Sequence, residues 1–443
     1  MKINKAQRRA LVAIAAGLAG TGVAHAAAFQ LKEQSAAGQG RAFAGSISQD
    51  GDATVVANNP AAMTLLDGRL FQADVAVIDY SVKFRGAGSD ALGRPLTGGN
   101  GGNAGDTSPV PSLYFHTPLT DRLHLGLSVT APFGFKTEYD DGWVGRYHGI
   151  KTDLKAVDVG AALSYKVNDM LSLGASVFAE RLEVKLRDAV DFGALLAASR
   201  VPGFLPGSAD GRLDIDGHNT ELGYTLGALL RPADGLSIGL AYRSEVKHSP
   251  DGAKVGFTVP AAANAILSAA RPGTFVDTTA STDITLPASW TLSLSQQLNE
   301  RWTVMADYSH TAWGKFSNVV LDFQSQLPSE TLHFGYRNTS FYSIGAEYRA
   351  NDQWTLRGGV AYDQTPVTDA VRDVRVPDVD RRWLSLGATW RASKRLSYSV
   401  GYTHLFLKDP SVDLRSASGS SLQGSYKLGS NIVAVSAQYA WGP

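Results

Sequence analysis

The segment LHLGLSV, residues 123–129, carries an apolar side chain at every second position. A period of two is typical of a β-strand with two unlike faces, because successive side chains point to opposite sides. Similar segments of about ten residues, the length of a membrane-spanning strand, follow one another from residue 69 to the end of the chain. We count about 14 of them, an even number as in bacterial outer-membrane barrels. The sequence therefore predicts an all-β fold, a transmembrane antiparallel β-barrel over residues 69–443.

The connections between these segments favour a membrane barrel over a soluble β-sandwich or propeller. Short turns, such as residues 168–169, 299–300 and 351–353, alternate along the chain with long loops. Short periplasmic turns and long extracellular loops are the pattern of bacterial barrels. Aromatic side chains also gather near strand ends, where the membrane interfaces are expected. They are Tyr165, Tyr242, Trp290, Trp302, Tyr348, Trp354, Trp390, Tyr398 and Trp441.

Residues 1–26 form a segment of a different kind. An apolar run covers residues 11–18, and Ala24-His25-Ala26 fits the small-residue rule of a cleavage site. The apolar run is too short to span a bilayer. The basic residues that precede it are Lys2, Lys5, Arg8 and Arg9. This three-part pattern predicts a secretory signal peptide, so we expect export and a mature chain that begins at Ala27.

Composition narrows the chemistry of the mature chain. It has no Cys, which excludes disulfides, thiol catalysis and thiolate metal sites. Without residues 1–26 it keeps 37 basic and 41 acidic residues, a formal charge of −4. Nothing in that charge points to nucleic acid as a partner. We expect neither a cofactor nor a metal.

One strand, over residues 171–187, changes the phase of its alternation. Leucine and valine occupy odd positions from 171 to 177 but even positions from 182 to 186. We interpret the change as a β-bulge near 178–180, since an extra residue exchanges the two faces of a strand. The bulge would turn the charged side chains Arg181, Glu183, Lys185 and Arg187 into the barrel. Such a cluster fits ordinary polar lining as well as it fits a ligand site.

Two long loops, residues 188–219 and 248–283, are unusually apolar. Within them, 191–200 and 261–271 have the pattern of short helices that end before Pro and Gly. Exposed loops rarely carry many apolar side chains unless these pack together or receive a ligand. The loops therefore either pack on one another or form an apolar groove for a hydrophobic ligand. The side chains concerned are Phe192, Leu195, Leu196, Phe204, Leu205, Phe257, Ile266 and Leu267.

Residues 27–68 fit neither pattern, because they are rich in Gly, Ala and Ser and need a surrounding structure to hold them. Several of their motifs, followed by others farther along, resemble the FadL family of outer-membrane transporters for long-chain fatty acids and other hydrophobic compounds. The N-terminal matches are AAFQL at 27–31, GQGRA at 38–42 and Asn59-Pro60-Ala61. The later ones are YRSEVK at 242–247, Leu286-Pro287 with Trp290, the run 357–367, and PDVDR at 377–381 with Trp383-Leu384-Ser385.

The resemblance implies that residues 27–68, with Asn59, Pro60 and Ala61, form a hatch that plugs the lumen. It also implies a groove between the two apolar loops, a luminal pocket beside Phe29, and a lateral opening in the barrel wall. The opening would lie at Ala131-Pro132-Phe133-Gly134, where Pro supports a break because it cannot donate to a strand ladder. Arg181 or Lys185 would serve the carboxylate of a fatty acid. The loop 316–337 matches the family poorly, so no functional residue is carried over there.

These features predict a channel of the bacterial outer membrane, surrounded by membrane lipid and lipopolysaccharide, and the family resemblance implies a monomer. We expect passive uptake of long-chain fatty acids, gated by rearrangement around Phe29 when ligand binds. A channel for toluene-like aromatic hydrocarbons is the alternative, because fold similarity does not choose between them. A lipase or esterase is less well supported, since the nine His residues lie in no local catalytic motif. A hatch in the lumen argues against an open porin.

Overall fold

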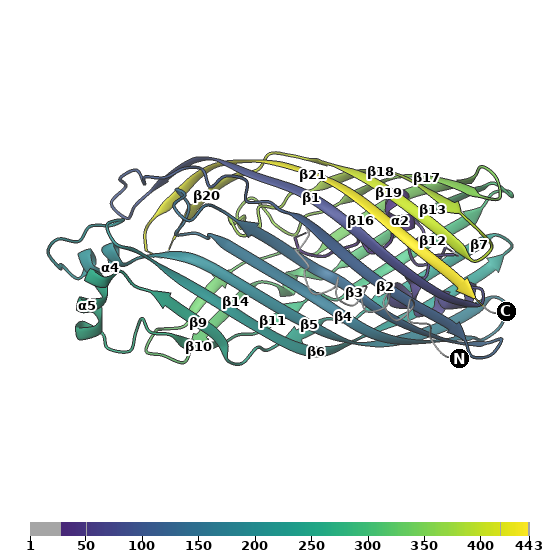
Figure 1. Ribbon diagram of the computed structural model, residues 1–443, viewed down its shortest axis with the longest axis horizontal. Helices are drawn as coiled ribbons and strands as arrows, with labels where there is room; N and C mark the ends of the chain where they lie inside the picture. The colour runs from purple at the N-terminus through teal and green to yellow at the C-terminus, as the bar shows by residue number, and fades with distance from the viewer. Residues whose placement is uncertain (1–27, 50, 417, 442–443) are drawn as a thin grey trace, which may run out of the picture.

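A computed structural model describes residues 28–49, 51–416 and 418–441 of the protein. The predicted signal peptide, residues 1–26, lies outside the described residues. Fourteen of the described strands form one closed antiparallel barrel (Figure 1), which confirms the predicted fold class. They are β1 (Arg69–Ser89), β2 (Thr107–Pro118), β3 (Leu123–Glu138), β4 (Lys151–Lys166), β5 (Leu171–Asp191), β6 (Asp210–Ala233), β7 (Leu236–Arg243), β12 (Ser289–Gln297), β13 (Trp302–Thr311), β16 (Thr339–Arg349), β17 (Trp354–Asp363), β18 (Arg381–Arg391), β19 (Leu396–Leu407) and β21 (Ser421–Trp441).

Pairing of the first barrel strand with the last closes the wall. β1 and β21 are in register from Arg69↔Trp441 to Ser89↔Ser421. Closure gives each strand two neighbours, so that backbone groups in the hydrocarbon region can be paired within the wall. The outer surface carries exposed apolar side chains such as Val159, Leu222 and Ile344. Aromatic rings meet near the short turns, where Trp302 and Tyr348 have ring centroids 4.7 Å apart.

Shorter elements extend the barrel at the end with the long connections, which we call the extracellular end. The strands are β8 (Val246–His248), β9 (Ala253–Thr258), β10 (Thr278–Ser281), β11 (Ile284–Leu286), β14 (Asn318–Phe323), β15 (Glu330–His333) and β20 (Ser411–Arg415). The helices are α4 (Phe192–Ala198), α5 (Ala261–Ala270) and the 3-10 helix η2 (Trp313–Lys315). α4 and α5 agree with the helices predicted for the two apolar loops. None of the helices in the described ranges is long and apolar enough to cross a membrane.

The predicted boundaries of the two apolar loops need correction. β5 continues to Asp191 and β6 begins at Asp210, so the first connection covers residues 192–209 rather than 188–219. The second, predicted over 248–283, contains β9, α5 and β10. The predicted loops were too long because strands that rise above the membrane lose the alternation by which a spanning strand is recognised.

The bulge predicted near residues 178–180 is absent. β5 pairs with both neighbours without a shift in register from Ser172 to Arg187. Arg181 and Lys185 consequently face outward, with side chains 49% and 52% exposed. The surroundings of the outer face of β5 change along the strand, from lipid to water. The outer face is apolar where it meets lipid and charged above the membrane, where it meets water.

Residues 28–49 and 51–68 lie inside the barrel, where α2 (Ala36–Gly40), α3 (Val55–Asn58) and the 3-10 helix η1 (Pro60–Leu65) follow one another. Figure 1 shows α2 enclosed by the strands of the wall. We call residues 28–68 the N-terminal segment. Its backbone approaches inward-facing glycines so closely that a Cβ on Gly387 would lie 2.7 Å from the Cα atom of Gly40. Asn59 donates amide hydrogen bonds to the carbonyl oxygens of Ile47 and Ala228.

These close contacts predict that a side chain at Gly359 displaces the N-terminal segment. A Cβ at this position of β17 would collide with the carbonyl oxygen of Arg41, which is backbone and cannot move aside alone. We expect Gly359→Val to speed proteolysis within residues 28–68 by about tenfold or more, since buried backbone becomes accessible. The barrel itself should still fold, as measured by its heat-dependent mobility in gels.

Gly429→Val is the matched control, because a Cβ at this strand glycine would meet no atom within 4 Å. Equal proteolysis of the two variants would contradict the tight packing of the segment against the wall.

Candidate binding pocket

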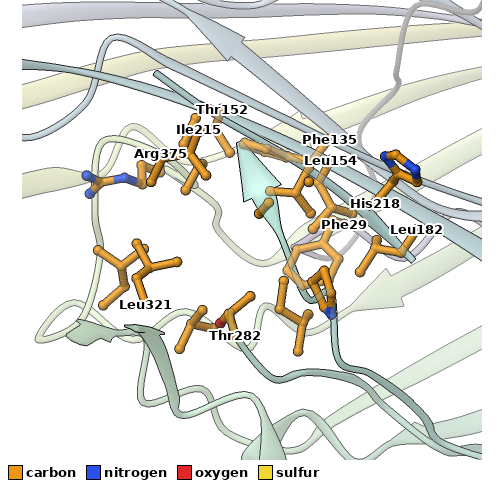
Figure 2. Close-up of a pocket in the computed structure, with 18 of the residues that line it drawn as sticks. Phe29, Phe135, Thr152, Leu154, Leu182, Ile215, His218, Thr282, Leu321 and Arg375 are labelled. Carbon is orange, nitrogen blue, oxygen red and sulfur yellow. The ribbon is translucent and has the colours of Figure 1, made fainter. Parts of the chain in front are cut away.

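An apolar pocket lies inside the extracellular half of the barrel (Figure 2). Its empty volume, including the part open to solvent, is about 870 Å³. One side consists of inward-facing residues of four neighbouring barrel strands, namely Phe135, Leu154, Leu182, Val184, Leu186 and Ile215. The other side consists of Ile284, Phe316, Val319, Leu321, Leu332 and Phe334. A pocket of this size and character suits a hydrophobic small molecule.

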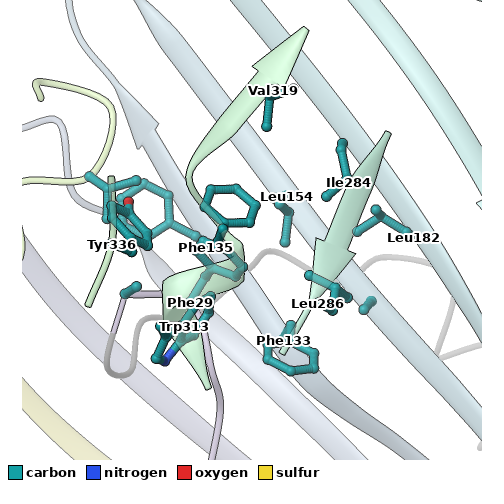
Figure 3. Packing of buried hydrophobic residues seen from close by; sticks show 14 of the residues in the cluster. Phe29, Phe133, Phe135, Leu154, Leu182, Ile284, Leu286, Trp313, Val319 and Tyr336 are labelled. Atoms are coloured by element: carbon teal, nitrogen blue, oxygen red, sulfur yellow. The ribbon is translucent and has the colours of Figure 1, made fainter. Parts of the chain in front are cut away.

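Phe29 closes the inner end of the apolar pocket. Its ring packs edge-on against Trp313, with centroids 4.5 Å apart, and lies 5.1 Å from Phe316 and 6.3 Å from Phe133. Figure 3 shows Phe29 between Trp313 and Phe133, and all four rings belong to one buried hydrophobic cluster. The side chain of Phe29 is 3% exposed. The ring therefore separates the apolar pocket from the lumen beyond it.

A second pocket with mixed lining lies beyond Phe29. Gln30, Lys32, Asn58 and Asp307 line it together with apolar residues. Its empty volume, open solvent included, is about 910 Å³. A hydrophobic molecule would leave apolar surroundings on entering this space, at a cost of roughly 0.8 kcal/mol for each exposed methylene.

The wall of the barrel is irregular at the predicted kink, Ala131-Pro132-Phe133-Gly134. The β3–β4 register jumps from Thr130↔Asp158 to Phe133↔Ala156, so Ala131 and Pro132 lie opposite a single residue. On the other side of β3, pairing with β2 ends at Leu113↔Val129. β2 nevertheless continues to pair with β1 as far as Thr107. The outer parts of β2 and β3 are thus not joined by the ladder.

The N-terminal segment covers this irregularity from inside. The amide of Leu31 donates to the carbonyl oxygen of Pro132 over 2.7 Å. The amide of Gly134 donates to the carbonyl oxygen of Phe29 over 2.8 Å. The amide of Ala28 donates to the Asp378 carboxylate over 2.8 Å. These bonds hold Phe29 in the position where it closes the pocket.

A group of charged side chains lies between the two pockets. Arg243 donates to Asp158 over 2.7 Å and to Glu180 over 2.6 Å, and its guanidinium carbon lies 4.0 Å from the centre of the Phe178 ring. His248 contacts the other oxygen of Glu180 at 3.1 Å. Pairing of this kind compensates the cost of burying each charge.

The predicted ligand residues fall into three places. Phe29 lies at the apolar pocket, as the resemblance implied. Arg181 and Lys185 point away from the lumen, which removes the predicted carboxylate partners from the inside of the barrel. The loop residues form a separate cluster that joins α4 to α5. In it Phe192, Leu196 and Leu267 are buried, and Leu195, Phe204, Phe257 and Ile266 are partly buried. Leu205 does not belong to this cluster and is 54% exposed.

Most of the pocket was missed by sequence reasoning. Leu182, Val184 and Leu186 were assigned to the outer face because of the assumed bulge. Phe316, Val319, Leu321, Leu332 and Phe334 belong to the loop that matched the family poorly. One usable signal was overlooked in β2, where Pro109 and Pro111 both lack an N–H. Proline is tolerated where a strand has an unpaired edge, so the pair indicated where the wall opens.

Fold and pocket together define an outer-membrane β-barrel with a hydrophobic site in its lumen. The chain belongs to the family described as Outer membrane protein transport protein (OMPP1/FadL/TodX), whose sequence profile matches residues 17–441. It is therefore an outer-membrane transporter of hydrophobic compounds and not an enzyme.

Three known proteins illustrate the similarity. A long-chain fatty acid transport protein of Escherichia coli O6:H1 is 30% identical over 411 residues, which are 90% of each chain. The crystal structure of a Pseudomonas aeruginosa FadL homologue, 30% identical, superposes with a TM-score of 0.86 and covers 94% of this chain and 100% of the other. The toluene transporter TbuX of Ralstonia pickettii is 20% identical, with a TM-score of 0.66 over 93% and 99% of the chains. This last similarity concerns the fold alone.

Docking of the N-terminal segment inside the barrel depends on pH through Glu33. The segment itself does not span the membrane. The side chain of Glu33 is 1% exposed, and neither carboxylate oxygen has a hydrogen-bond partner among the described residues. Burial raises the pKa of Glu33 from 4.5 to about 7. Because the docked pKa is the higher one, protonation favours docking. The contribution of protonated Glu33 to the stability of the docked segment is complete below about pH 4.5. It is lost as the pH rises through about 7.

We predict that Glu33→Gln makes docking of the segment less dependent on pH. A shift from 4.5 to about 7 corresponds to roughly 3 kcal/mol when the group is fully ionised. Hydrogen exchange of residues 28–49, corrected for the intrinsic effect of pH, should accelerate between pH 5 and pH 8 in the unchanged protein. The variant should show a clearly smaller increase. An identical increase in both proteins would exclude Glu33 as the source.

Proposed function

We propose that the protein is a passive, ligand-gated channel for long-chain fatty acids. The observation that carries the proposal is the apolar pocket that ends at Phe29, next to the irregular wall between β2 and β3. No step of this route needs an energy source, because a hydrophobic ligand moves between apolar surroundings throughout.

The route has three stages. Ligand first lands on the apolar cluster of α4 and α5, where partly buried side chains such as Phe204 and Ile266 offer a hydrophobic surface. It then enters the apolar pocket. It finally leaves sideways, between β2 and β3, into the membrane. A lateral exit is favoured because the space beyond Phe29 has polar lining.

Residues 28–68 act as the hatch in this proposal. Ligand in the apolar pocket presses on Phe29, and movement of Phe29 breaks the backbone bonds to Pro132 and Gly134. The same movement uncovers the gap between β2 and β3. Binding and opening are thereby coupled through residues 29–31. The hatch also obstructs the lumen, which argues against an open porin.

Aromatic hydrocarbons are the alternative substrate class. The E. coli relative is named for long-chain fatty acid transport, whereas the TbuX structure is titled a toluene transporter. The apolar pocket suits an alkyl chain and an alkylbenzene alike. We propose further that the protein acts as a monomer in contact with membrane lipid and lipopolysaccharide, and that residues 1–26 are removed on export.

Competition binding separates the two substrate classes. The purified protein in lipid nanodiscs would be given a labelled long-chain fatty acid or a labelled alkylbenzene, each in competition with the other. We expect saturable binding of the fatty acid that excess alkylbenzene displaces weakly. Saturable binding of the alkylbenzene alone would assign an aromatic-hydrocarbon channel. Binding of neither compound would reject the proposed function.

Removal of Pro132 tests the lateral exit. The deletion takes out the extra residue of β3 and lets Thr130 and Phe133 join one continuous ladder with β4. We expect fatty acid uptake by whole cells to fall by at least about tenfold, while binding to the purified protein changes little. Equal uptake would contradict an exit at this place.

A matched control for the deletion is Pro132→Ala, which keeps the number of residues and therefore the irregular register. It should transport nearly as well as the unchanged protein.

A further inference from the structure

The outer end of the apolar pocket contains a cation whose charge is already compensated. Arg375 lines the pocket, and its guanidinium donates to Asp188 over 2.7 Å and to Asp373 over 2.9 Å. In Figure 2 this guanidinium lies at the edge of the pocket and points away from the apolar side chains. Two carboxylates thus surround one guanidinium, so this end of the pocket has an excess of negative charge.

The inner end has a similar arrangement. Asn219 lines the pocket and contacts His248, which contacts Glu180, which in turn accepts from Arg243. Arg243 also donates to Asp158. The group contains two carboxylates and one guanidinium.

Between these ends, the described residues that line the apolar pocket include one other titratable side chain, His218. It is exposed and occupies an outward-facing position of β6. Lys32 lines the second pocket rather than the apolar one, and its ammonium lies 4.3 Å from the centre of the Phe341 ring. Phe29 and Phe133 separate the two spaces. Among the described residues that line the apolar pocket, the one guanidinium, that of Arg375, is therefore compensated by carboxylates.

We propose, resting on the channel function proposed above, that the apolar pocket binds its ligand in an uncharged form. Esters, hydrocarbons and protonated fatty acids fit it, and permanently anionic head groups are rejected. An ionised head group loses its hydration on entering an apolar pocket, and this cost is large unless a cation pairs with it. Asp188 with Asp373 at one end, and Asp158 with Glu180 at the other, hold the available guanidinium groups and repel an anion.

Two ligands with carbon chains of the same length but different head groups test the proposal. Methyl palmitate is neutral, whereas hexadecanesulfonate is anionic at every accessible pH. Each would compete with labelled methyl palmitate for the protein in zwitterionic nanodiscs, after correction for partitioning into protein-free discs. We expect the sulfonate to bind at least about tenfold more weakly, a difference of about 1.4 kcal/mol. Equal or tighter binding of the sulfonate would overturn the proposal and leave the channel function standing.

A double variant should reverse the preference. Asp188→Asn with Asp373→Asn removes both carboxylates that accept hydrogen bonds from Arg375 but keeps both side chains as acceptors. We expect sulfonate affinity to rise by about tenfold relative to that of the ester. Asp216→Asn is the control, since Asp216 pairs with Lys185 on the outer surface, where both side chains are more than half exposed.

The outcomes separate this inference from the proposed function. An unchanged preference in the double variant, with ester binding intact, would show that compensation of Arg375 does not exclude anions. Failure of the unchanged protein to bind methyl palmitate would reject the apolar pocket as a binding site, and the inference with it.

Discussion

Pairing of backbone groups in hydrocarbon is the constraint on which the rest of this structure depends. A buried N–H or C=O without a partner costs several kcal/mol in lipid, and the barrel meets this demand by joining β1 to β21. Closure creates an interior that must be filled or remain open to water. The N-terminal segment fills it, and the glycines of the wall allow its backbone to approach closely.

The wall departs from regular pairing where transport is proposed to occur. Between the outer parts of β2 and β3 the ladder is missing, and Pro109 and Pro111 reduce the number of donors left along that edge. The N-terminal segment supplies partners from inside, through Phe29 and Leu31. The same three residues, 29–31, thus satisfy the wall and close the pocket, which explains how movement of one ring could affect both.

The charged side chains in the lumen are arranged in compensated groups. Arg375 and Arg243 each donate to two carboxylates, which compensate the charge of the guanidinium. This arrangement keeps the apolar pocket electrically unattractive to charged head groups while the surrounding polar network stays paired. The preference for a neutral ligand would then follow from the pairing of the charges as much as from the apolar lining.

The sequence alone determined the barrel, its approximate strand number and the two helices of the apolar loops, whereas the kink at residues 131–134 was implied by the family resemblance and supported by Pro132. These features depend on local alternation and on proline chemistry, which can be read along the chain. Only the tertiary structure decided which face of β5 points inward, because the same charged residues fit a lumen or a strand above the membrane. It also brought together the walls of the pocket, which come from Phe29, from β3 to β6, from residues 250–334 and from Arg375 and Val376, far apart in the chain. Their proximity results from closure of the barrel, and no local pattern encodes it.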